Sequence, residues 1–276
     1  MKPVKILMCE PKYFDVNYSG NEFMKDNINN VNKENALAQW CGLKRVYENL
    51  NFEVVTINPA ENLVDMVFTA NQSLPFIDKT GNRKVILSKM KNVQRKMEIP
   101  YFKEFYLENN YEVIELSDEI EYFESEGDCV IDFERNILFG GYGYRTEKKV
   151  YDIISNYVNF KIVKFNLVNP VLYHLDTCFS VLNSDTVVIS ESAFNEEGMN
   201  IIKSYFKTII KADETENLKF FVCNCHCPDG KNVIVQKGSV IFKNDIIKNG
   251  FNLIEVETGE FMKSGGSVFC MKLMFY

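Results

Sequence analysis

The chain has 276 residues, of which 46% are hydrophobic and 25% are charged, and its formal net charge is −7. This length allows one large domain with a substantial core, and an acidic chain without a basic stripe argues against a nucleic-acid partner. No apolar run approaches the length of a membrane span, and the first residues lack the apolar core of a signal peptide, so we expect a cytoplasmic protein with no membrane contact.

Five similar units recur along the chain, each an amphipathic helical stretch followed by a short β-branched strand. The expected helices are Lys44–Leu50, Phe102–Glu108, Val150–Tyr157, Glu197–Tyr205 and Ser239–Lys248. The expected strands after them are Asn51–Ile57, Tyr111–Leu116, Phe160–Phe165, Phe206–Ile210 and Phe251–Val256. Alternation within each strand indicates one buried face.

Further β-like runs lie between these units. They are Lys84–Leu87, Cys129–Ile131, Ile137–Phe139, Cys178–Leu182, Thr186–Ile189, Phe220–Cys225, Asn232–Val235 and Val268–Tyr276. Five matched α/β units favour a closed ring over an open doubly wound sheet. We therefore expect residues 1–276 to form a single α/β domain in which strand ends from every unit surround one central pocket.

Polar residues interrupt several of these apolar runs. Four acids crowd the stretch Glu121–Asp128, and His174 and Asp176 would share one face of a strand. The apolar run Val67–Asn71, expected as a strand, ends in an amide, and a glycine-rich stretch presents Arg145. Each feature also has a structural interpretation, as a solvated loop, a core histidine paired with an acid, or a surface ion pair.

The cysteines offer two candidate chemistries. Cys223, Cys225 and Cys227 would point to one face of a strand but lack the usual spacing of zinc ligands, so we expect no metal site there and do not expect His226 to be the functional imidazole. Cys270 follows a small-residue turn at 264–267, in an apolar run that would otherwise make it a core residue.

A nucleophilic cysteine needs a base or cation to raise its thiolate fraction, and His174 supplies one. Carboxylates are natural partners of a guanidinium group. A thiol, an imidazole and several carboxylates around one pocket therefore suggest attack on an amidine or guanidine carbon.

The whole pattern resembles the guanidino-group-modifying superfamily of arginine deiminases, dimethylarginine dimethylaminohydrolases and glycine amidinotransferases. The landmarks, in order, are Cys9–Val16, Asp65–Asn71, Phe123–Asp128, Gly141–Thr146, His174–Phe179 and Gly265–Met271. The resemblance implies a five-bladed α/β propeller, or pentein, with ββαβ repeats and a central active site.

The resemblance also implies a role for each matching residue. Cys270 would attack the guanidinium carbon, His174 would protonate the leaving amine and later activate water, and Glu124 would bind the guanidinium. Asp176 would hold the guanidinium nitrogens, and Arg145 would bind the substrate α-carboxylate.

Three more residues complete the expected site. Asn21 matches an asparagine near the site entrance. Asn71 stands where deiminases usually have Asp, and this substitution resembles arginine dihydrolases, which convert arginine to ornithine. By the resemblance, Lys89 stands where relatives have an arginine that binds the substrate carboxylate, and it offers a point charge in place of a planar fork.

The leading prediction is a cysteine hydrolase that needs no cofactor or metal and converts arginine to ornithine, ammonia and carbon dioxide. The alternatives are an arginine deiminase, a dimethylarginine dimethylaminohydrolase, or an inactive member that binds an amino acid. The expected partner is a small guanidino substrate, with a homo-oligomer left open.

Overall fold

The computed structural model describes residues 2–276, which form nine α-helices and fourteen strands. The helices are α1 (Lys33–Asn49), α2 (Val93–Lys96), α3 (Ile99–Glu108), α4 (Ser125–Asp128), α5 (Val150–Ile154), α6 (Glu196–Tyr205), α7 (Glu214–Phe220), α8 (Ile241–Lys248) and α9 (Gly259–Met262). The strands are β1 (Lys5–Cys9), β2 (Glu53–Ile57), β3 (Ser73–Ile77), β4 (Arg83–Leu87), β5 (Glu112–Ile114), β6 (Cys129–Asp132), β7 (Ile137–Tyr142), β8 (Lys161–Asn166), β9 (Phe179–Val181), β10 (Thr186–Ile189), β11 (Thr208–Lys211), β12 (Asn232–Gln236), β13 (Asn252–Val256) and β14 (Leu273–Phe275).

The strands form small mixed sheets with a common pattern. The orders are β14-β1-β2, β3-β4-β5, β6-β7-β8, β9-β10-β11 and β12-β13. In each three-stranded sheet the central strand pairs antiparallel with one neighbour and parallel with the other. In the last sheet β12 and β13 are parallel, and an antiparallel bridge between His226 and Ile234 stands in for the third strand. The fold is therefore mixed α/β.

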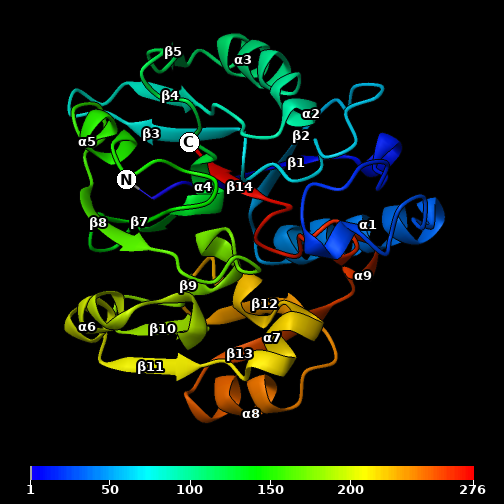
Figure 1. Cartoon of the computed structure of the whole chain (residues 1–276), viewed down its shortest axis with the longest axis vertical. Coiled ribbons are helices and arrows are strands. Elements are labelled where there is room, and N and C mark those ends of the chain that lie inside the picture. Colours follow the sequence, from blue (N-terminus) through cyan, green and yellow to red (C-terminus); the bar gives the residue numbers. More distant parts are fainter. Residues whose placement is uncertain (1) are drawn as a thin grey trace.

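Each parallel pair of strands is joined through a helix, because parallel pairing needs a crossover connection. The connecting helices are α1, α3, α5, α6 and α8, and Figure 1 places all five at the periphery of the molecule, outside the sheets. The five predicted helix–strand units are confirmed, although α1 begins earlier, at Lys33, and α5 ends earlier, at Ile154, than expected. Among residues 2–276, no helix is both long enough and apolar enough to cross a lipid bilayer.

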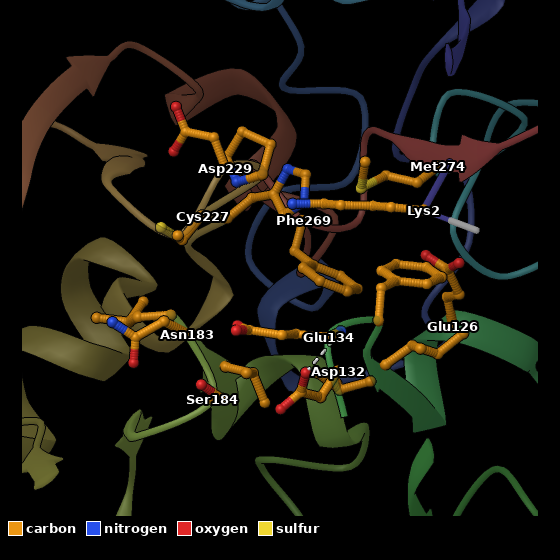
Figure 2. A pocket seen from close by; sticks show the side chains of 18 of the residues that line it. Lys2, Glu126, Asp132, Glu134, Asn183, Ser184, Cys227, Asp229, Phe269 and Met274 are labelled. Atoms are coloured by element: carbon orange, nitrogen blue, oxygen red, sulfur yellow. Dashed lines mark hydrogen bonds between the residues drawn. The ribbon is translucent and has the colours of Figure 1, made fainter. Parts of the chain in front are cut away.

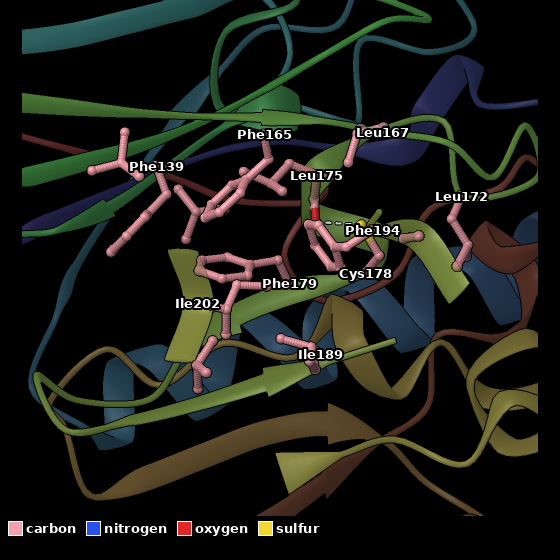
Figure 3. Packing of buried hydrophobic residues seen from close by; sticks show 14 of the residues in the cluster. Phe139, Phe165, Leu167, Leu172, Leu175, Cys178, Phe179, Ile189, Phe194 and Ile202 are labelled. Carbon is pink, nitrogen blue, oxygen red and sulfur yellow. Dashed lines mark hydrogen bonds between the residues drawn. The ribbon is translucent and has the colours of Figure 1, made fainter. Parts of the chain in front are cut away.

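Aromatic side chains join neighbouring sheets into one packed unit. In the cluster of Figure 3, the Phe139 ring of β7 lies 6.0 Å from Phe165 of β8, 5.2 Å from Phe179 of β9 and 5.3 Å from Phe206. Ring centroids at these separations gain contact energy beyond simple area burial. Because the rings come from two sheets, the two sheets cannot separate without exposing them.

The predicted strand Phe220–Cys225 is wrong. Helix α7 ends at Phe220, Phe221 takes a left-handed φ of 51°, and a 3-10 turn covers Val222–Asn224. The backbone N–H of Cys223 donates a hydrogen bond to the side chain of Asn217 at 2.9 Å. A side chain therefore provides the acceptor that a neighbouring strand would provide in a sheet. The apolar composition of this stretch reflects burial, which does not distinguish a strand from a buried turn.

The stretches that carry Asn71, His174 and Cys270 are also turns, and not the strands expected for them. The Asn71 amide bonds back to the carbonyl of Phe68 at 3.3 Å, and His174 precedes a 3-10 turn at Leu175–Thr177. Cys270 lies in a turn that ends before β14, so only the last part of the predicted C-terminal strand is extended. The candidate residues therefore sit on loops beside the strands.

Helix α5 is tied to its sheet by Tyr151, whose hydroxyl lies 2.6 Å from the carbonyl oxygen of Gly141 and 3.0 Å from that of Asp128. We expect Tyr151→Phe to lower the free energy of unfolding by about 1–2 kcal/mol, because it removes a buried hydroxyl that donates to these carbonyls. Chemical denaturation measures this loss, and Tyr157→Phe, at an exposed tyrosine, is the control. Equal stability of the two variants would contradict the assignment.

Candidate active site

A pocket collects residues that are far apart in the sequence. Five of the predicted residues line it: Asn21, Asn71, Arg145, His174 and Cys270. Glu124 and Asp176 lie directly behind it with no exposed surface, each bonded to one of the lining residues. The structure therefore brings together seven of the eight residues expected from the sequence.

The turn that carries Cys270 depends on glycine. Gly265 has a φ of +87°, and a Cβ atom there would lie 2.9 Å from the amide nitrogen of Asn21 and 3.0 Å from the hydroxyl of Tyr173. Asn21 Nδ2 uses this space to donate to the Tyr173 hydroxyl at 3.0 Å and to the carbonyl of Ser264 at 2.9 Å. The predicted entrance residue thus braces the turn before the thiol.

The Cys270 thiol contacts a carboxylate. Its Sγ donates a hydrogen bond to Oδ2 of Asp176 at 3.0 Å and accepts one from Nδ2 of Asn224 at 3.2 Å. Burial, and then the charge of Asp176, raise the pKa of the thiol well above its usual range. Without a ligand the thiol is therefore protonated, and a cation entering the pocket would favour the thiolate.

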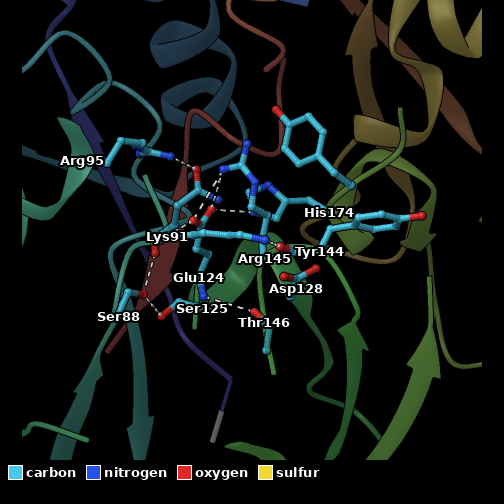
Figure 4. A network of polar contacts seen from close by, with 12 residues as sticks. Ser88, Lys91, Arg95, Glu124, Ser125, Asp128, Tyr144, Arg145, Thr146 and His174 are labelled. Atoms are coloured by element: carbon cyan, nitrogen blue, oxygen red, sulfur yellow. Dashed lines mark hydrogen bonds and ion pairs between the residues drawn. The ribbon is translucent and has the colours of Figure 1, made fainter. Parts of the chain in front are cut away.

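Glu124 is ionised and serves as the anchor for His174 (Figure 4). Burial alone would raise the pKa of Glu124, but the hydrogen bond from His174 Nε2 at 2.8 Å, the His174 charge and the Arg145 charge lower it to about 2. Arg145 Nη1 lies 3.3 Å from the same carboxylate, and the Lys91 backbone donates to its other oxygen at 3.0 Å. The imidazole is therefore held beside a fixed negative charge.

Asp176 and Asp128 behave differently from Glu124. Burial raises the pKa of each to about 7, and in each carboxylate one oxygen has no hydrogen-bond partner within residues 2–276. The other oxygen of Asp128 accepts from the Leu175 amide at 3.0 Å and so holds the loop that carries His174. Buried acceptors without partners are available to the N–H groups of a bound cation.

The orientation of the Asn71 amide follows from its neighbour. Arg95 Nη1 donates to Oδ1 of Asn71 at 2.8 Å, and because a guanidinium only donates, the oxygen must face Arg95. Nδ2 therefore points the other way, and it has no partner within the described chain. A Cβ atom on Gly127 would lie 2.5 Å from this nitrogen and 3.2 Å from the His174 ring, so glycine permits a free donor beside the imidazole.

Lys89 does not belong to the pocket, contrary to the expectation from sequence. Its Nζ bonds the carbonyl of Ser117 at 2.8 Å and Asp118 at 3.3 Å, while its backbone pairs with Phe123. The preceding Ser88 points inward to the carbonyl of Asn71, so the alternation of an extended backbone sends Lys89 outward.

Arg95 is the cation that the sequence reasoning missed. It lines the pocket, and Glu98 binds its Nε at 3.2 Å and its Nη2 at 3.1 Å. Gln72 in turn donates to Glu98 at 2.7 Å. The spacing of Arg95 and Glu98, three residues apart, was the available signal for an ion pair, although nothing in the sequence marked it as buried.

A second cavity of about 310 Å³ contains none of the eight predicted residues (Figure 2). Glu126, Phe269 and Lys272 line it, and they are sequence neighbours of Glu124 and Cys270 whose side chains point elsewhere. Lys272 Nζ lies 3.0 Å from Glu126 and 3.4 Å from the centroid of the Phe269 ring. The smaller pocket around Cys270 is the candidate active site, because a thiol and an imidazole line it together.

His226 also lines this second cavity. Its Nδ1 lies 2.9 Å from the hydroxyl of Tyr47, and burial lowers its pKa well below the usual value. Within residues 2–276, no three His, Cys, Asp or Glu side chains are arranged to hold a metal ion.

Comparison with known proteins finds relatives whose names refer to enzymes of arginine or dimethylarginine. Residues 10–275 match the family described as N,N dimethylarginine dimethylhydrolase, eukaryotic. The bifunctional arginine dihydrolase/ornithine cyclodeaminases AgrE of Nostoc sp. and ArgZ of Synechocystis sp. are each 32% identical over 98% of this chain, which spans 37% of their length. An N(G),N(G)-dimethylarginine dimethylaminohydrolase of Mycobacterium tuberculosis is 28% identical over 96% of this chain and 84% of its own.

Solved structures of similar fold come from the same two groups of enzymes. The substrate-bound N-terminal domain of ArgZ, an arginine dihydrolase from cyanobacteria, has a TM-score of 0.90 and 32% identity over 98% of this chain and 97% of that domain. A Pseudomonas aeruginosa dimethylarginine dimethylaminohydrolase complexed with citrulline has a TM-score of 0.80 at 19% identity, covering 100% of both chains, which supports the fold alone.

The raised pKa of Asp176 predicts a pH-dependent stability. Its pKa lies near 7 in the folded chain against an ordinary 3.8, so the folded state binds the extra proton and stability falls as the pH rises from about 4 to about 7. Asp176→Asn removes this loss. We expect it to be more stable than the parent by roughly 1–4 kcal/mol above pH 7 and equal to it near pH 4.

Thermal unfolding followed by circular dichroism between pH 4 and 8 measures the difference. Asp118→Asn, at a fully exposed aspartate, is the control and should change nothing. A stability difference between Asp176→Asn and the parent that stays constant with pH would contradict the assignment.

Proposed function

The chain belongs to the N,N dimethylarginine dimethylhydrolase family, and we propose that it is a cysteine hydrolase that converts arginine to ornithine, two ammonia molecules and carbon dioxide. The observation that carries the choice of product is the free Nδ2 donor of Asn71 beside the imidazole of His174. The similarity to arginine dihydrolase domains over nearly the whole chain supports the choice of substrate.

In the first half of the proposed reaction, the guanidinium binds between the carboxylates of Glu124 and Asp176. Its positive charge favours the Cys270 thiolate, which burial and Asp176 otherwise disfavour. The thiolate attacks the guanidinium carbon, and the carbon–nitrogen bond breaks as His174 protonates the departing ammonia. His174 then takes a proton from water, which attacks the carbon and expels the thiolate, leaving a ureido group in the pocket.

The second half depends on Asn71. A guanidinium offers only N–H donors, whereas a ureido group carries an oxygen acceptor that Nδ2 of Asn71 can bind. This contact retains the ureido species while Cys270 attacks again and a second ammonia leaves. Water then cleaves the thiocarbamate, and the resulting carbamate loses carbon dioxide to give ornithine. Two waters are consumed overall, so the atoms balance.

The substrate carboxylate would meet the guanidinium groups of Arg145 and Arg95 at the same pocket. Arg145 keeps donors available because, among residues 2–276, its acceptors are Glu124 and the Gly20 carbonyl, the latter at 3.0 Å. Arg95 has its donors engaged by Asn71, Glu98 and backbone carbonyls, so its first role is to orient Asn71.

Dimethylarginine dimethylaminohydrolase is the second candidate, and the description of the matching family favours it. It would use the same thiol, imidazole and carboxylates, with dimethylamine as the leaving group. An arginine deiminase that releases citrulline would differ only in losing the ureido species before the second attack. An inactive member that only binds an amino acid would keep the pocket without turnover.

We also infer that the five sheets form the blades of a five-bladed propeller that closes as one domain over residues 1–276. The support is the repeated pairing pattern and the pairing of the last strand, β14, with the first, β1. Such closure would place the loops after different strands around one centre, where the candidate residues meet.

Incubation of the purified protein with arginine, citrulline and asymmetric dimethylarginine tests the function. We expect ornithine and ammonia from arginine, in a two-to-one ratio of ammonia to ornithine, and no product from Cys270→Ser. Mass spectrometry identifies the products. Citrulline from arginine supports the deiminase, dimethylamine from dimethylarginine supports the second candidate, and no turnover of any substrate contradicts the proposal.

Asn71→Asp should release citrulline in place of ornithine. A carboxylate near Arg95 can still bind a guanidinium but cannot donate to the ureido oxygen. Asn92→Asp, at another asparagine that lines the pocket, is the matched control and should still give ornithine. If Asn71→Asp also makes only ornithine, the amide does not decide the product.

A further inference from the structure

Asn224 lies in the Cys223–Cys227 segment, for which the sequence indicated no function. Its side chain is 1% exposed and reaches the turn that carries Cys270. The neighbouring Cys223 and Cys225 are both buried in an apolar cluster with strand residues. Their burial fixes the short segment and leaves the Asn224 side chain directed at the thiol.

The orientation of the Asn224 amide is determined by its partners. Oδ1 accepts from the backbone N–H groups of Ser267 at 3.1 Å, Phe269 at 3.1 Å and Cys270 at 3.3 Å. Backbone nitrogens only donate, so the oxygen must face the turn. Nδ2 therefore faces the other way and donates to Cys270 Sγ at 3.2 Å and to the carbonyl of Asp176 at 3.0 Å.

Two side chains with opposite effects contact the thiol. Within residues 2–276, Sγ of Cys270 makes side-chain hydrogen bonds to Asp176 and Asn224. The carboxylate of Asp176 stabilises the protonated thiol, whereas an N–H donor stabilises the thiolate. Two further groups interact electrostatically with this pair. Tyr173 does so with the thiol, and the positive charge of Lys272 lowers the pKa of Asp176. Of the two contacting side chains, only Asn224 favours the reactive form.

We propose that Asn224 is a catalytic residue that donates a hydrogen bond to the Cys270 thiolate while its oxygen holds the backbone of the nucleophile's turn. The inference rests on the proposed function, in which the thiolate appears both as attacking group and as leaving group. When an adduct is hydrolysed, the carbon–sulfur bond breaks and its electron pair returns to sulfur. The Nδ2–H bond stabilises that charge in each departure, much as a donor stabilises an oxyanion.

Two substitutions separate this role from simple support of the turn. Asn224→Asp keeps an oxygen for the three backbone N–H groups, which hold the new carboxylate ionised, but it removes the donor to sulfur. Asn224→Ala removes both contacts and adds no charge. Asn217→Asp is the matched control, because Asn217 is a buried asparagine that bonds Thr177 and Cys223 and forms no hydrogen bond with Cys270.

The test measures the rate at which iodoacetamide alkylates Cys270 in the unliganded protein between pH 6 and 11. Mass spectrometry of the peptide that contains Cys270 separates it from the other seven cysteines. We expect the rate at pH 8 to fall about 10-fold in both Asn224 variants and to stay unchanged in Asn217→Asp. With arginine, kcat should fall roughly 100-fold with little change in KM.

An unchanged alkylation profile in a folded Asn224→Asp protein overturns the inference, whatever happens to turnover. If Asn224→Ala does not fold, the Asp variant decides alone. Alkylation needs no substrate, so the thiol contact can be confirmed or rejected even if the parent protein turns over no guanidino compound. In that case the proposed function fails while the contact stands.

Discussion

The site depends on one buried charge, the carboxylate of Glu124. An isolated carboxylate with no exposed surface would cost several kcal/mol, so the folded chain must surround it with donors. The donors are the His174 ring, the Arg145 guanidinium and the backbone of Lys91. These three donors lie on the loops that follow strands β8, β7 and β4. The Glu124 carboxylate therefore holds three loops in place, and no single loop could supply enough donors to stabilise the charge.

Two asparagines then set the chemistry around that charge. Asn71 is oriented by Arg95 and Asn224 by three backbone N–H groups, and in both cases a neighbour that can only donate takes the amide oxygen. Each Nδ2 is thereby turned away from that neighbour. In the proposed reaction the Asn71 donor would bind a ureido oxygen, and the Asn224 donor contacts the sulfur of Cys270. Glu98 and Gln72 extend this arrangement outward by fixing Arg95.

Much of the fold could be predicted because the spacing of hydrophobic residues along the chain indicates helices and strands. The helices α3, α6 and α8 and the strands that follow them lie within a few residues of the expected ranges, whereas α1 ends where expected but begins much earlier, at Lys33. The errors fell at Phe220–Cys225, at Val67–Asn71 and around Cys270, where apolar residues are buried in turns. In these stretches side chains such as Asn217 form hydrogen bonds with backbone groups. Amino-acid composition alone does not show whether a backbone group bonds to a neighbouring strand or to a side chain.

The sequence by itself determined the repeating α/β units, the residue types of the site and the likeness to guanidino-modifying enzymes, because periodicity and motif order are properties of the chain. Tertiary structure decided which residues meet. It excluded Lys89, whose strand-like backbone turns it outward, and added Arg95 and Asn224. It also decided which end of each amide faces the pocket, because that choice depends on donors brought from distant segments and on no property of the asparagine itself.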